Sequence, residues 1–348
     1  MRTNVSLLTV GFLASLLIFA CSQSNCDDTP TPTPEVTKPQ TFTNNSKVTF
    51  PNLFCVSFAD SINGYISGSA GFVNKTTDGG KTWTNVSVAS TQDMYGVYFL
   101  NKNEGYAAGN TGDLFKTTNA GTNWNKLTTP NSSNNYAQIH FFDGLNGIAG
   151  GGTLSRNGAL IKTTDGGANW TDIPVPGMSS IYDIEFIDNT TGYICGCDNN
   201  IFKTTDGGAT WVNQPVTITT PANNTILLSE IEFVSSTVGY SVGYSISFDK
   251  NFIFKTTSAG ATWNQLTSPS QTSSTADVFA SFFAASADEI CIVGGNVANN
   301  TATLLKSIDV GMPWSDVVLN ASRLSGSTFI QNTSYSVGLN GTIIKSSN

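Results

Sequence analysis

The sequence predicts an all-β fold built from a repeated module, and three observations lead to this prediction. The 348 residues include 33 Gly and are only 11% charged, and Thr, Asn and Ser are abundant while Leu and Lys are scarce. No amphipathic run exceeds about ten residues, which disfavours a helical bundle and an α/β enzyme. Similar segments also recur along most of the chain at a regular spacing.

The repeated segment begins with Lys and ends with Trp. Its six copies are KTTDGGKTW (75–83), KTTNAGTNW (116–124), KTTDGGANW (162–170), KTTDGGATW (203–211), KTTSAGATW (255–263) and KSIDVGMPW (306–314), and a seventh, KSSN, begins at Lys345. The first Ser or Thr lies at position 76 in the first copy and 346 in the last, so the six intervals average 45 residues. Periods of about 20 to 50 residues indicate repeat architectures, and this one fits a β-propeller blade.

Each repeat contains four strand-like pieces in the same order. An alternating apolar strand such as MYGVYF (94–99) is followed by a short strand of small residues such as GYAAG (105–109). A third strand ends in Lys-Thr-Thr, and after a turn a fourth begins at Trp. Four strands per repeat match one blade.

The turn between the third and fourth strands is a folding device. Asp78 can accept hydrogen bonds from backbone N–H groups of its own turn, and the two glycines after it can take a positive φ. Trp83 should bury its ring and find an acceptor for its indole N–H. We expect the structural positions of these turns to be Asp78, Trp83, Asn119, Trp124, Asp165, Trp170, Asp206, Trp211, Ser258, Trp263, Asp309 and Trp314.

These turns resemble the Asp-box, or bacterial neuraminidase repeat, with the pattern Ser/Thr-x-Asp-x-Gly-x-Thr-Trp. With the repeated Gly-Tyr-x-x-Gly, residues 41–348 are most similar to the propeller of the photosystem II assembly/stability factor family. Asn119, Ser258 and Asn348 replace the Asp, and Pro313 replaces the Thr before Trp314. The resemblance implies a non-catalytic assembly scaffold. It also implies an arginine-rich docking surface, which this chain lacks, so the family's photosystem partner is not carried over.

The two ends of the repeat region should close the ring. The seventh repeat has no fourth strand after Asn348, and an unpaired strand edge needs a partner. Thr41-Phe42-Thr43-Asn44 reads like Thr82-Trp83-Thr84-Asn85. We therefore predict a seven-bladed β-propeller of four-stranded antiparallel blades, closed by the N-terminal strand, with Thr41 close to Asn348.

The N-terminal segment predicts export and a lipid anchor. Residues 1–20 have one cation followed by about fifteen uncharged residues, which is the length of a signal peptide. Cys21 after Ala20 resembles a bacterial lipoprotein signal, and residues 21–40 form a Pro- and Thr-rich linker. We expect the propeller, 41–348, to be held to the outer membrane on its periplasmic or cell-surface side; an ordinary secreted protein is the alternative.

Charge and composition exclude several functions. The net charge is −8 and the only arginines are Arg2, Arg156 and Arg323, so no basic stripe exists for nucleic acid. A sialidase-like site would need three arginines to hold the substrate carboxylate, and two remain after the leader. A single His140 excludes multi-His metal sites, and we expect no metal and no cofactor.

Three neighbouring inner strands carry polar residues at matching positions two apart. The candidate binding residues are Gln138, His140, Asp183, Glu185, Glu230 and Glu232. Strand alternation places each pair on one side of its strand, near the axis. These residues could bond to neighbouring blades, bind a cation or basic peptide, or form the carboxylate pair of a carbohydrate-active hydrolase.

Two further residue types recur. The Cys residues at 195 and 197 lack a second pair for zinc, so we interpret them as small buried residues. One Lys per repeat precedes the Thr-Thr, which favours a structural role on every blade over a positive rim. We conclude that the chain is a non-catalytic lipoprotein propeller with a protein or glycan partner.

Overall fold

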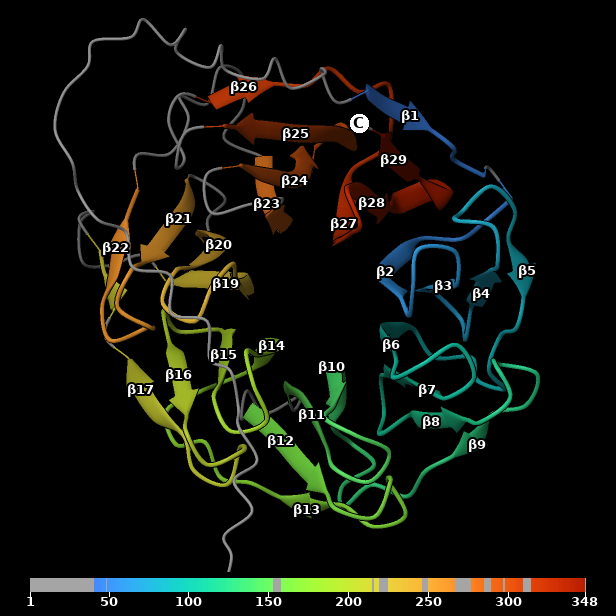
Figure 1. Ribbon diagram of the computed structural model, residues 1–348, viewed down its shortest axis with the longest axis vertical. Helices are drawn as coiled ribbons and strands as arrows, with labels where there is room; N and C mark the ends of the chain where they lie inside the picture. Colours follow the sequence, from blue (N-terminus) through green and yellow to red (C-terminus); the bar gives the residue numbers. More distant parts are fainter. Residues whose placement is uncertain are drawn as a thin grey trace, which may run out of the picture. The chain divides into compact units, whose positions relative to one another are not determined.

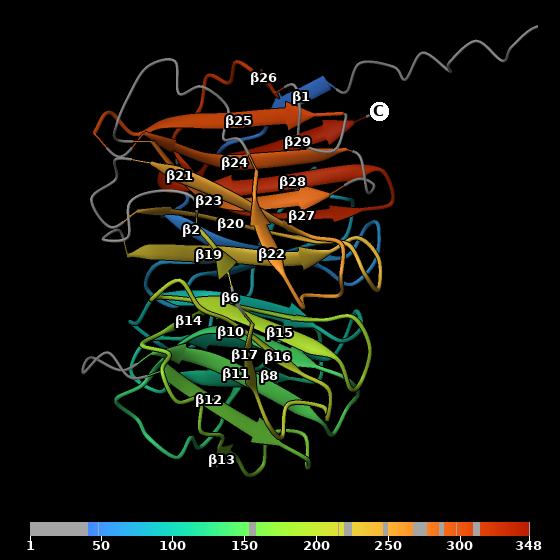
Figure 2. The same cartoon turned by 90° about the vertical axis from the view of Figure 1, so that its left-hand side faces the viewer.

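The computed structural model describes residues 41–47, 49–152, 158–214, 216–218, 225–245, 250–266, 277–284, 289–296, 298–308 and 314–347. The predicted signal peptide (1–20), Cys21, the linker (21–40) and Asp309 lie outside these ranges. The described residues belong to one compact unit, Pro39–Asn348. They form seven antiparallel sheets around a central axis, as Figure 1 shows, which confirms the predicted seven-bladed propeller. In the side view of Figure 2, strands such as β19 and β25 run from one face of the ring towards the other.

Each blade consists of an inner, a second, a third and an outer strand. The inner strands are β2 (Leu53–Phe58), β6 (Met94–Phe99), β10 (Asn135–Phe141), β14 (Ile181–Phe186), β19 (Ile226–Phe233), β23 (Asp277–Ala284) and β27 (Leu324–Ile330). The second strands are β3 (Gly64–Gly68), β7 (Gly105–Gly109), β11 (Gly147–Gly152), β15 (Gly192–Gly196), β20 (Gly239–Ser245), β24 (Ile290–Asn296) and β28 (Thr333–Gly338). The third strands are β4 (Val73–Thr76), β8 (Leu114–Thr117), β12 (Gly158–Thr163), β16 (Ile201–Thr204), β21 (Asn251–Thr256), β25 (Thr301–Ser307) and β29 (Ile343–Ser347). The outer strands are β5 (Thr84–Asn85), β9 (Asn125–Lys126), β13 (Thr171–Asp172), β17 (Val212–Gln214), β22 (Trp263–Gln265), β26 (Trp314–Asp316) and β1 (Thr41–Asn44).

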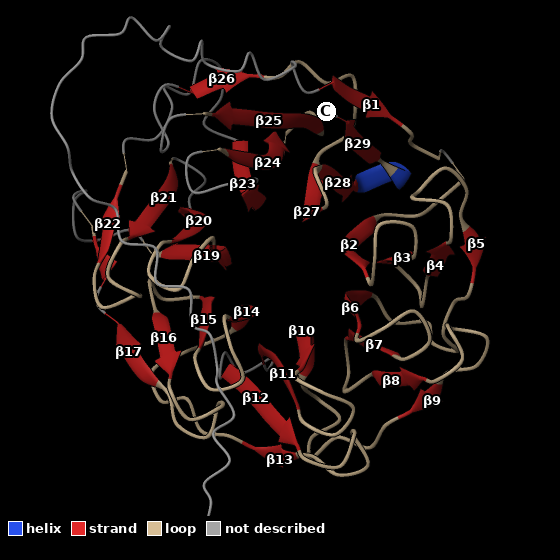
Figure 3. Cartoon of the chain, viewed as in Figure 1, coloured by secondary structure: helices blue, strands red, loops and turns tan. Residues whose placement is uncertain are grey.

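Two elements depart from the regular blade. In the fifth blade a short strand, β18 (Val216–Thr217), adds to the outer edge in parallel with β22. A single 3₁₀ turn, η1 (Leu339–Gly341), connects β28 to β29 and is drawn in blue in Figure 3. Within the described ranges, no helix has the length and apolar character needed to cross a membrane.

The first and last strands close the ring. Strand β1 pairs antiparallel with β29, and Thr41 lies opposite Ser347. The pairing supplies the missing outer strand of the seventh blade, and Figure 1 shows β1 lying along its rim. The backbone N–H of Asn45 extends the contact by donating to the carbonyl of Ile343 at 2.8 Å. The prediction that the N-terminal strand completes the last blade is confirmed.

Aromatic side chains join each blade to the next. Phe141, at the end of β10, stacks on Tyr106 of the preceding blade with ring centroids 3.7 Å apart. The same ring meets the edge of Trp170 of its own blade at 6.0 Å. A Cβ on Gly105 would lie 2.5 Å from the Phe99 ring, so the second strand begins with Gly because the inner-strand ring lies against it. The equivalent triads are Tyr65–Phe99–Trp124, Tyr193–Phe233–Trp263 and Tyr335–Phe58–Trp83.

The repeated lysines hold the turn of the following blade. Lys203 Nζ donates to the Ala259 carbonyl at 2.7 Å, and it lies 5.4 Å from the centroid of the Tyr193 ring. Lys345 Nζ donates in the same way to the Gly79 carbonyl at 2.8 Å, from the last blade to the first. Two more bonds of this kind are Lys116 to Gly166 and Lys162 to Gly207. The structural role predicted for the repeated lysines is confirmed for these four.

The turns themselves are closed by side-chain hydrogen bonds. Asp78 Oδ1 accepts from the backbone N–H groups of Lys81 and Thr82, both at 2.9 Å, and Thr76 Oγ1 accepts from Gly80 N. Where the repeat has no Asp, Asn119 Oδ1 accepts from Asn123 N at 2.9 Å, and Ser258 Oγ accepts from Thr262 N at 3.1 Å. A different polar side chain therefore serves the same turn.

The expectation for the indole N–H is wrong for Trp83. The Trp124 N–H donates to the Val86 carbonyl at 2.7 Å, whereas the Trp83 N–H is buried without an acceptor among the described residues. The Trp83 ring lies 6.5 Å from the Phe58 ring in an edge contact. Ring packing, rather than a hydrogen bond, therefore anchors this turn.

Candidate functional site: an axial cavity

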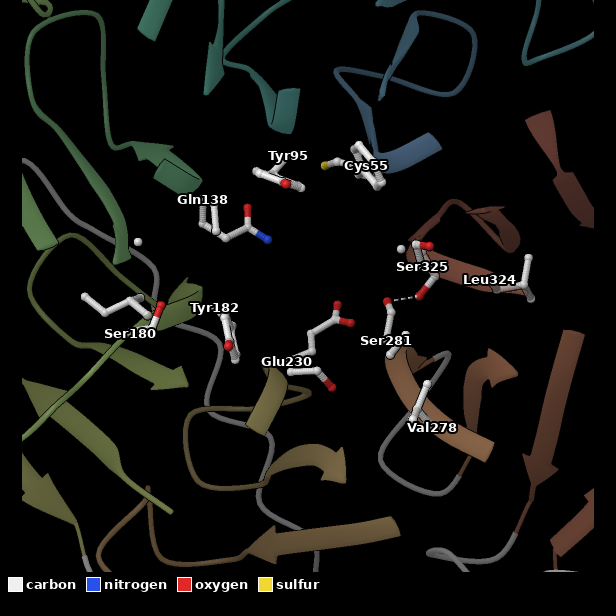
Figure 4. A pocket seen from close by; sticks show the side chains of 18 of the residues that line it. Cys55, Tyr95, Gln138, Ser180, Tyr182, Glu230, Val278, Ser281, Leu324 and Ser325 are labelled. Carbon is white, nitrogen blue, oxygen red and sulfur yellow. Dashed lines mark hydrogen bonds between the residues drawn. The ribbon is translucent and has the colours of Figure 1, made fainter. Parts of the chain in front are cut away.

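A cavity of about 530 Å³ lies on the axis of the ring, and all seven blades contribute to its lining. It is formed where the inner strands begin, because its walls include residues at or just before their first positions, such as Asn135, Ser180 and Arg323. Asn110, in the turn between β7 and β8, also contributes. The turns with the repeat motif follow the third strands at the opposite ends of the blades. Figure 4 shows the cavity from close by.

A β-bulge near the start of every inner strand supplies one side chain to this cavity. In β14, Ile181 pairs with Gly196 and Asp183 with Cys195, so Tyr182 is the extra residue between two ladder pairs. The other six inner strands show the same shift. A bulge re-aims the side chain of the extra residue. The seven bulge residues, all in the cavity lining, are Phe54, Tyr95, Ala137, Tyr182, Ser229, Ala280 and Ser325.

The walls of the cavity differ in chemistry from blade to blade. The bulge residues of the first, second and fourth blades are aromatic, and the rings of Phe54 and Tyr95 lie 5.0 Å apart. The other four bulge residues are Ala or Ser. In Figure 4, Tyr95, the amide of Gln138, Tyr182 and Glu230 lie around the open space. The charged members of the lining are Glu230 and Arg323.

In the fourth, fifth and sixth blades, the residue that follows the bulge bonds to the next blade. Asp183 Oδ2 accepts a hydrogen bond from Ile231 N of the fifth blade at 2.9 Å, and its Oδ1 accepts from Ile184 N. Glu230 Oε2 accepts from Phe282 N of the sixth blade at 2.9 Å. Ser281 at the same position bonds to Ser327 of the seventh blade at 2.6 Å. The predicted blade-to-blade role of Asp183 and Glu230 is thus present.

The second residue of each candidate pair lies further along its strand. In the strand register these residues pair with the neighbouring second strand: His140 with Ile148, Glu185 with Tyr193, and Glu232 with Tyr240. None of the three candidates belongs to the cavity lining. The His140 ring packs between aromatic rings, with centroids 5.3 Å from both Tyr98 and Phe186. The register confirms that the three pairs occupy equivalent positions. Only Gln138 and Glu230 of the six face the cavity.

Burial and mutual repulsion shift the titration of these carboxyl groups. Burial raises the pKa of Asp183 to about 6, against the opposing effect of its two backbone donors. The pKa of Glu230 is raised well above its ordinary value, mainly by burial and secondly by the negative charge of Asp183. Burial, followed by the charges of Glu232 and Asp183, does the same for the pKa of Glu185. Burial lowers the pKa of His140 to about 4, so this residue is neutral at pH 7.

This arrangement does not support the hydrolase alternative. A two-carboxylate hydrolase needs an acid and a base or nucleophile that face the same pocket. Both oxygens of Asp183 are occupied by backbone donors, and Glu230 is the only carboxylate in the lining of the described cavity. Among the described residues, no group of three or more His, Cys, Asp or Glu side chains could hold a metal ion.

The cysteines are placed as small packing residues. Cys195 is fully buried and its Sγ donates to the Leu228 carbonyl of the next blade at 3.5 Å. Cys197 is half-buried, and its Sγ donates to the Tyr182 hydroxyl at 3.3 Å. The interpretation of Cys195 as a buried small residue is confirmed.

The sequence reasoning missed the bulge residues. It assumed strict alternation along the inner strands, whereas in six of the seven inner strands the buried positions on either side of the bulge are three residues apart. Leu53 and Val56, or Ile181 and Ile184, are examples of this spacing. A spacing of three in an otherwise alternating strand was the available signal.

Comparisons with known proteins place this propeller in a family. The family model of photosynthesis system II assembly factor YCF48 matches residues 38–174 and 166–236, which together make up more than half of the chain. The chain belongs to this family. No curated protein matches the sequence of this YCF48-family propeller.

Solved structures share its fold at low sequence identity. The structure "YCF48 bound to D1 peptide" is 17% identical, covers 90% of this chain and 98% of its own, and has a TM-score of 0.69. YCF48 from Cyanidioschyzon merolae is also 17% identical, covers 88% of this chain and 98% of its own, and has a TM-score of 0.67. A GH74 xyloglucanase from Xanthomonas campestris is 13% identical, with 87% of this chain and 53% of its own covered and a TM-score of 0.66. Binding proteins and enzymes therefore share this fold, and the function has to be argued from the cavity.

Proposed function

We propose that this chain is an exported lipoprotein whose propeller binds a segment of a partner protein in the axial cavity and acts as a non-catalytic assembly scaffold. The observation that carries the proposal is the bulge in every inner strand, which brings one extra residue of each blade to the lining of one concave site. Because bulges re-aim side chains and are common next to active sites, we interpret this repeated bulge as a feature of a ligand-binding surface and not of packing.

The size and lining of the cavity suit an extended segment of protein. Its volume of about 530 Å³ lies within the ~300–1,000 Å³ of ligand sites. Tyrosine has an apolar ring and a polar hydroxyl, and it is enriched at protein–protein interfaces. The cavity lining contains four aromatic residues: Phe54, Tyr95, Tyr182 and Tyr244. The relative described as YCF48 bound to D1 peptide supports a peptide ligand for this chain as well, without identifying its partner.

Photo-crosslinking in intact cells tests the scaffold. A benzophenone amino acid replaces Tyr95 in the cavity, and a matched control replaces Lys81, which is exposed in a repeat turn at the other end of the blade. We expect one protein to be captured from position 95 and not from position 81. Equal capture from both positions, or a glycan array that retains the chain when no protein is captured, would overturn the proposal.

The lipid anchor is proposed from the sequence alone. The uncharged stretch in residues 1–20 followed by Cys21 supports it, and the Pro-rich linker supports display of the propeller away from the membrane. We expect the wild type to incorporate labelled palmitate. The Cys21→Ala variant should incorporate none and should be recovered in the soluble fraction. Label retained in Cys21→Ala would contradict the anchor. Protease treatment of intact cells then separates a periplasmic from a cell-surface location.

A further inference from the structure

We propose that the axial cavity receives the cationic side chain of a lysine or arginine from the partner protein, with Glu230 as its counter-ion and Tyr95 and Tyr182 as aromatic walls. This inference rests on the proposed function, because it assigns a chemistry to the segment that the scaffold binds. It follows from the geometry of the lining and from the distribution of charge along the axis.

The aromatic wall is suited to a cation. The face of a tyrosine or phenylalanine ring attracts an ammonium or guanidinium group within about 6 Å of its centroid. Tyr95 and Tyr182 are bulge residues that extend into the open space from two blades, and Phe54 stands beside Tyr95 at 5.0 Å. The protein already uses this interaction internally, since Lys203 lies 5.4 Å from the Tyr193 ring. The cavity offers similar rings without a lysine of the chain in its lining.

Carboxyl groups are concentrated beneath the cavity. Asp183, Glu185, Glu230 and Glu232 come from two adjacent inner strands, and their interactions oppose ionisation. His140 is neutral at pH 7 and does not offset them, because burial lowers its pKa. A cationic side chain beside Glu230 would relieve this repulsion, and a neutral sugar would not. The site therefore favours a cation over a glycan.

The groups around Glu230 come from several elements. They include the thiols of Cys55 and Cys195, the carboxylates of Asp183 and Glu232, and the charge of Arg323 at the rim. The Arg323 charge, just before β27, acts on the hydroxyl of Tyr244 in β20. Burial and the neighbouring carboxylates raise the pKa of Glu230, so a cation bound beside it should favour its ionised form and drive any proton that it carries into the solvent.

Binding of two small probes to the purified full chain tests the inference. The probes are Nα-acetyl-lysine methylamide and its uncharged counterpart Nα-acetyl-norleucine methylamide, measured by calorimetry in two buffers of different ionisation enthalpy. We expect the lysine probe to bind at least tenfold more tightly, with release of a proton, and to bind more tightly at higher pH. Equal affinity for the two probes, or no binding of the lysine probe at millimolar concentration, would overturn the inference.

Three variants locate the effect. Glu230→Gln keeps an acceptor for Phe282 N and removes the charge, so it should weaken the lysine probe about tenfold and abolish proton release. Tyr95→Leu should weaken the same probe severalfold. Lys81→Ala, at an exposed position in a repeat turn outside the cavity lining, should leave the affinity unchanged. Unchanged affinity in Glu230→Gln, with an unchanged melting temperature, would exclude the proposed counter-ion.

The two proposals can fail separately. If crosslinking captures a partner whose segment in the cavity contains neither lysine nor arginine, the scaffold stands and the cation is wrong. If the lysine probe binds as expected and no protein is captured from position 95, the cavity recognises a cation and the scaffold is wrong.

Discussion

Replacing Tyr193 tests how the blades are joined, because this residue combines two contacts with the next blade and one with a lysine of its own blade. Its ring is fully buried and stacks on Phe233 at 4.1 Å, its hydroxyl donates to the Ala259 carbonyl at 2.8 Å, and Lys203 Nζ lies above the ring. Two substitutions separate these contacts. Tyr193→Phe removes only the hydrogen bond, and Tyr193→Ala removes the ring as well.

The two substitutions should differ severalfold in cost. Tyr193→Phe should lower the free energy of unfolding by about 0.5–1 kcal/mol, because Lys203 still donates to the same carbonyl and no buried acceptor is left unsatisfied. Tyr193→Ala should cost about 3–5 kcal/mol for the cavity it creates. The lost aromatic pair should add about 0.5–1.5 kcal/mol.

Urea unfolding monitored by tryptophan fluorescence measures these values, and Trp263 next to Phe233 is a local reporter. Tyr335→Phe removes the equivalent bond, to the Gly79 carbonyl, at the junction of the last and first blades and should cost the same amount. Val318→Ala, at a residue with 95% of its surface exposed, should change stability by less than about 0.5 kcal/mol. A Tyr193→Ala cost below about 1 kcal/mol would refute the argument that stacked rings join the blades.

Three further predictions concern the strands, the titrating groups and the ring closure. Gly105→Ala should destabilise by about 1–3 kcal/mol, because its Cβ would lie 2.5 Å from an inner-strand ring, whereas Gly144→Ala, with its nearest atom at 3.9 Å, should be nearly neutral in the same urea assay. Melting temperature should be highest near pH 4–5. Burial raises the pKa of Asp183 from 3.8 to about 6, so stability is lost as the pH rises through that interval. Hydrogen bonds from its turn lower the pKa of Asp206 to about 2, so stability is also lost as the pH falls from about 4 to about 2. A melting temperature that rises between pH 5 and 7 would contradict the first of these signs. Phe42→Ala in the closing strand should cost about 2 kcal/mol, since the half-buried ring packs against the last two blades, and calorimetry should show a single transition at lower temperature.

Much of the fold could be predicted because each repeat contains its own blade and part of the next interface. The inner-strand phenylalanine contacts the Tyr of the second strand in the preceding blade and the Trp of its own blade. The Lys of the third strand bonds to the turn of the following blade. Packing therefore explains why the motif recurs along the chain. The closing strand was predictable from the resemblance of Thr41-Phe42 to Thr82-Trp83. Short local patterns therefore specified long-range neighbours.

The candidate site was only partly predictable. The pairs on the third to fifth inner strands were placed in the correct register, yet only Gln138 and Glu230 face the cavity. Tyr95 and Tyr182 were not singled out, because a bulge adds one residue to the strand and changes which side chain faces the axis. The bond from Ile231 N to Asp183 depends on the position of the next blade, which no pattern within one strand contains.

The direction of the lysine bonds has a consequence for how the molecule comes apart. Each of these lysines donates to the succeeding blade, and the last blade donates to the first through Lys345 and Gly79, so no module is an end module. Stacked solenoids fray from their termini because a terminal repeat has one neighbour. Here every module has two, so loss of any one interface should propagate around the circle, and hydrogen exchange in the central strands should report one shared opening free energy.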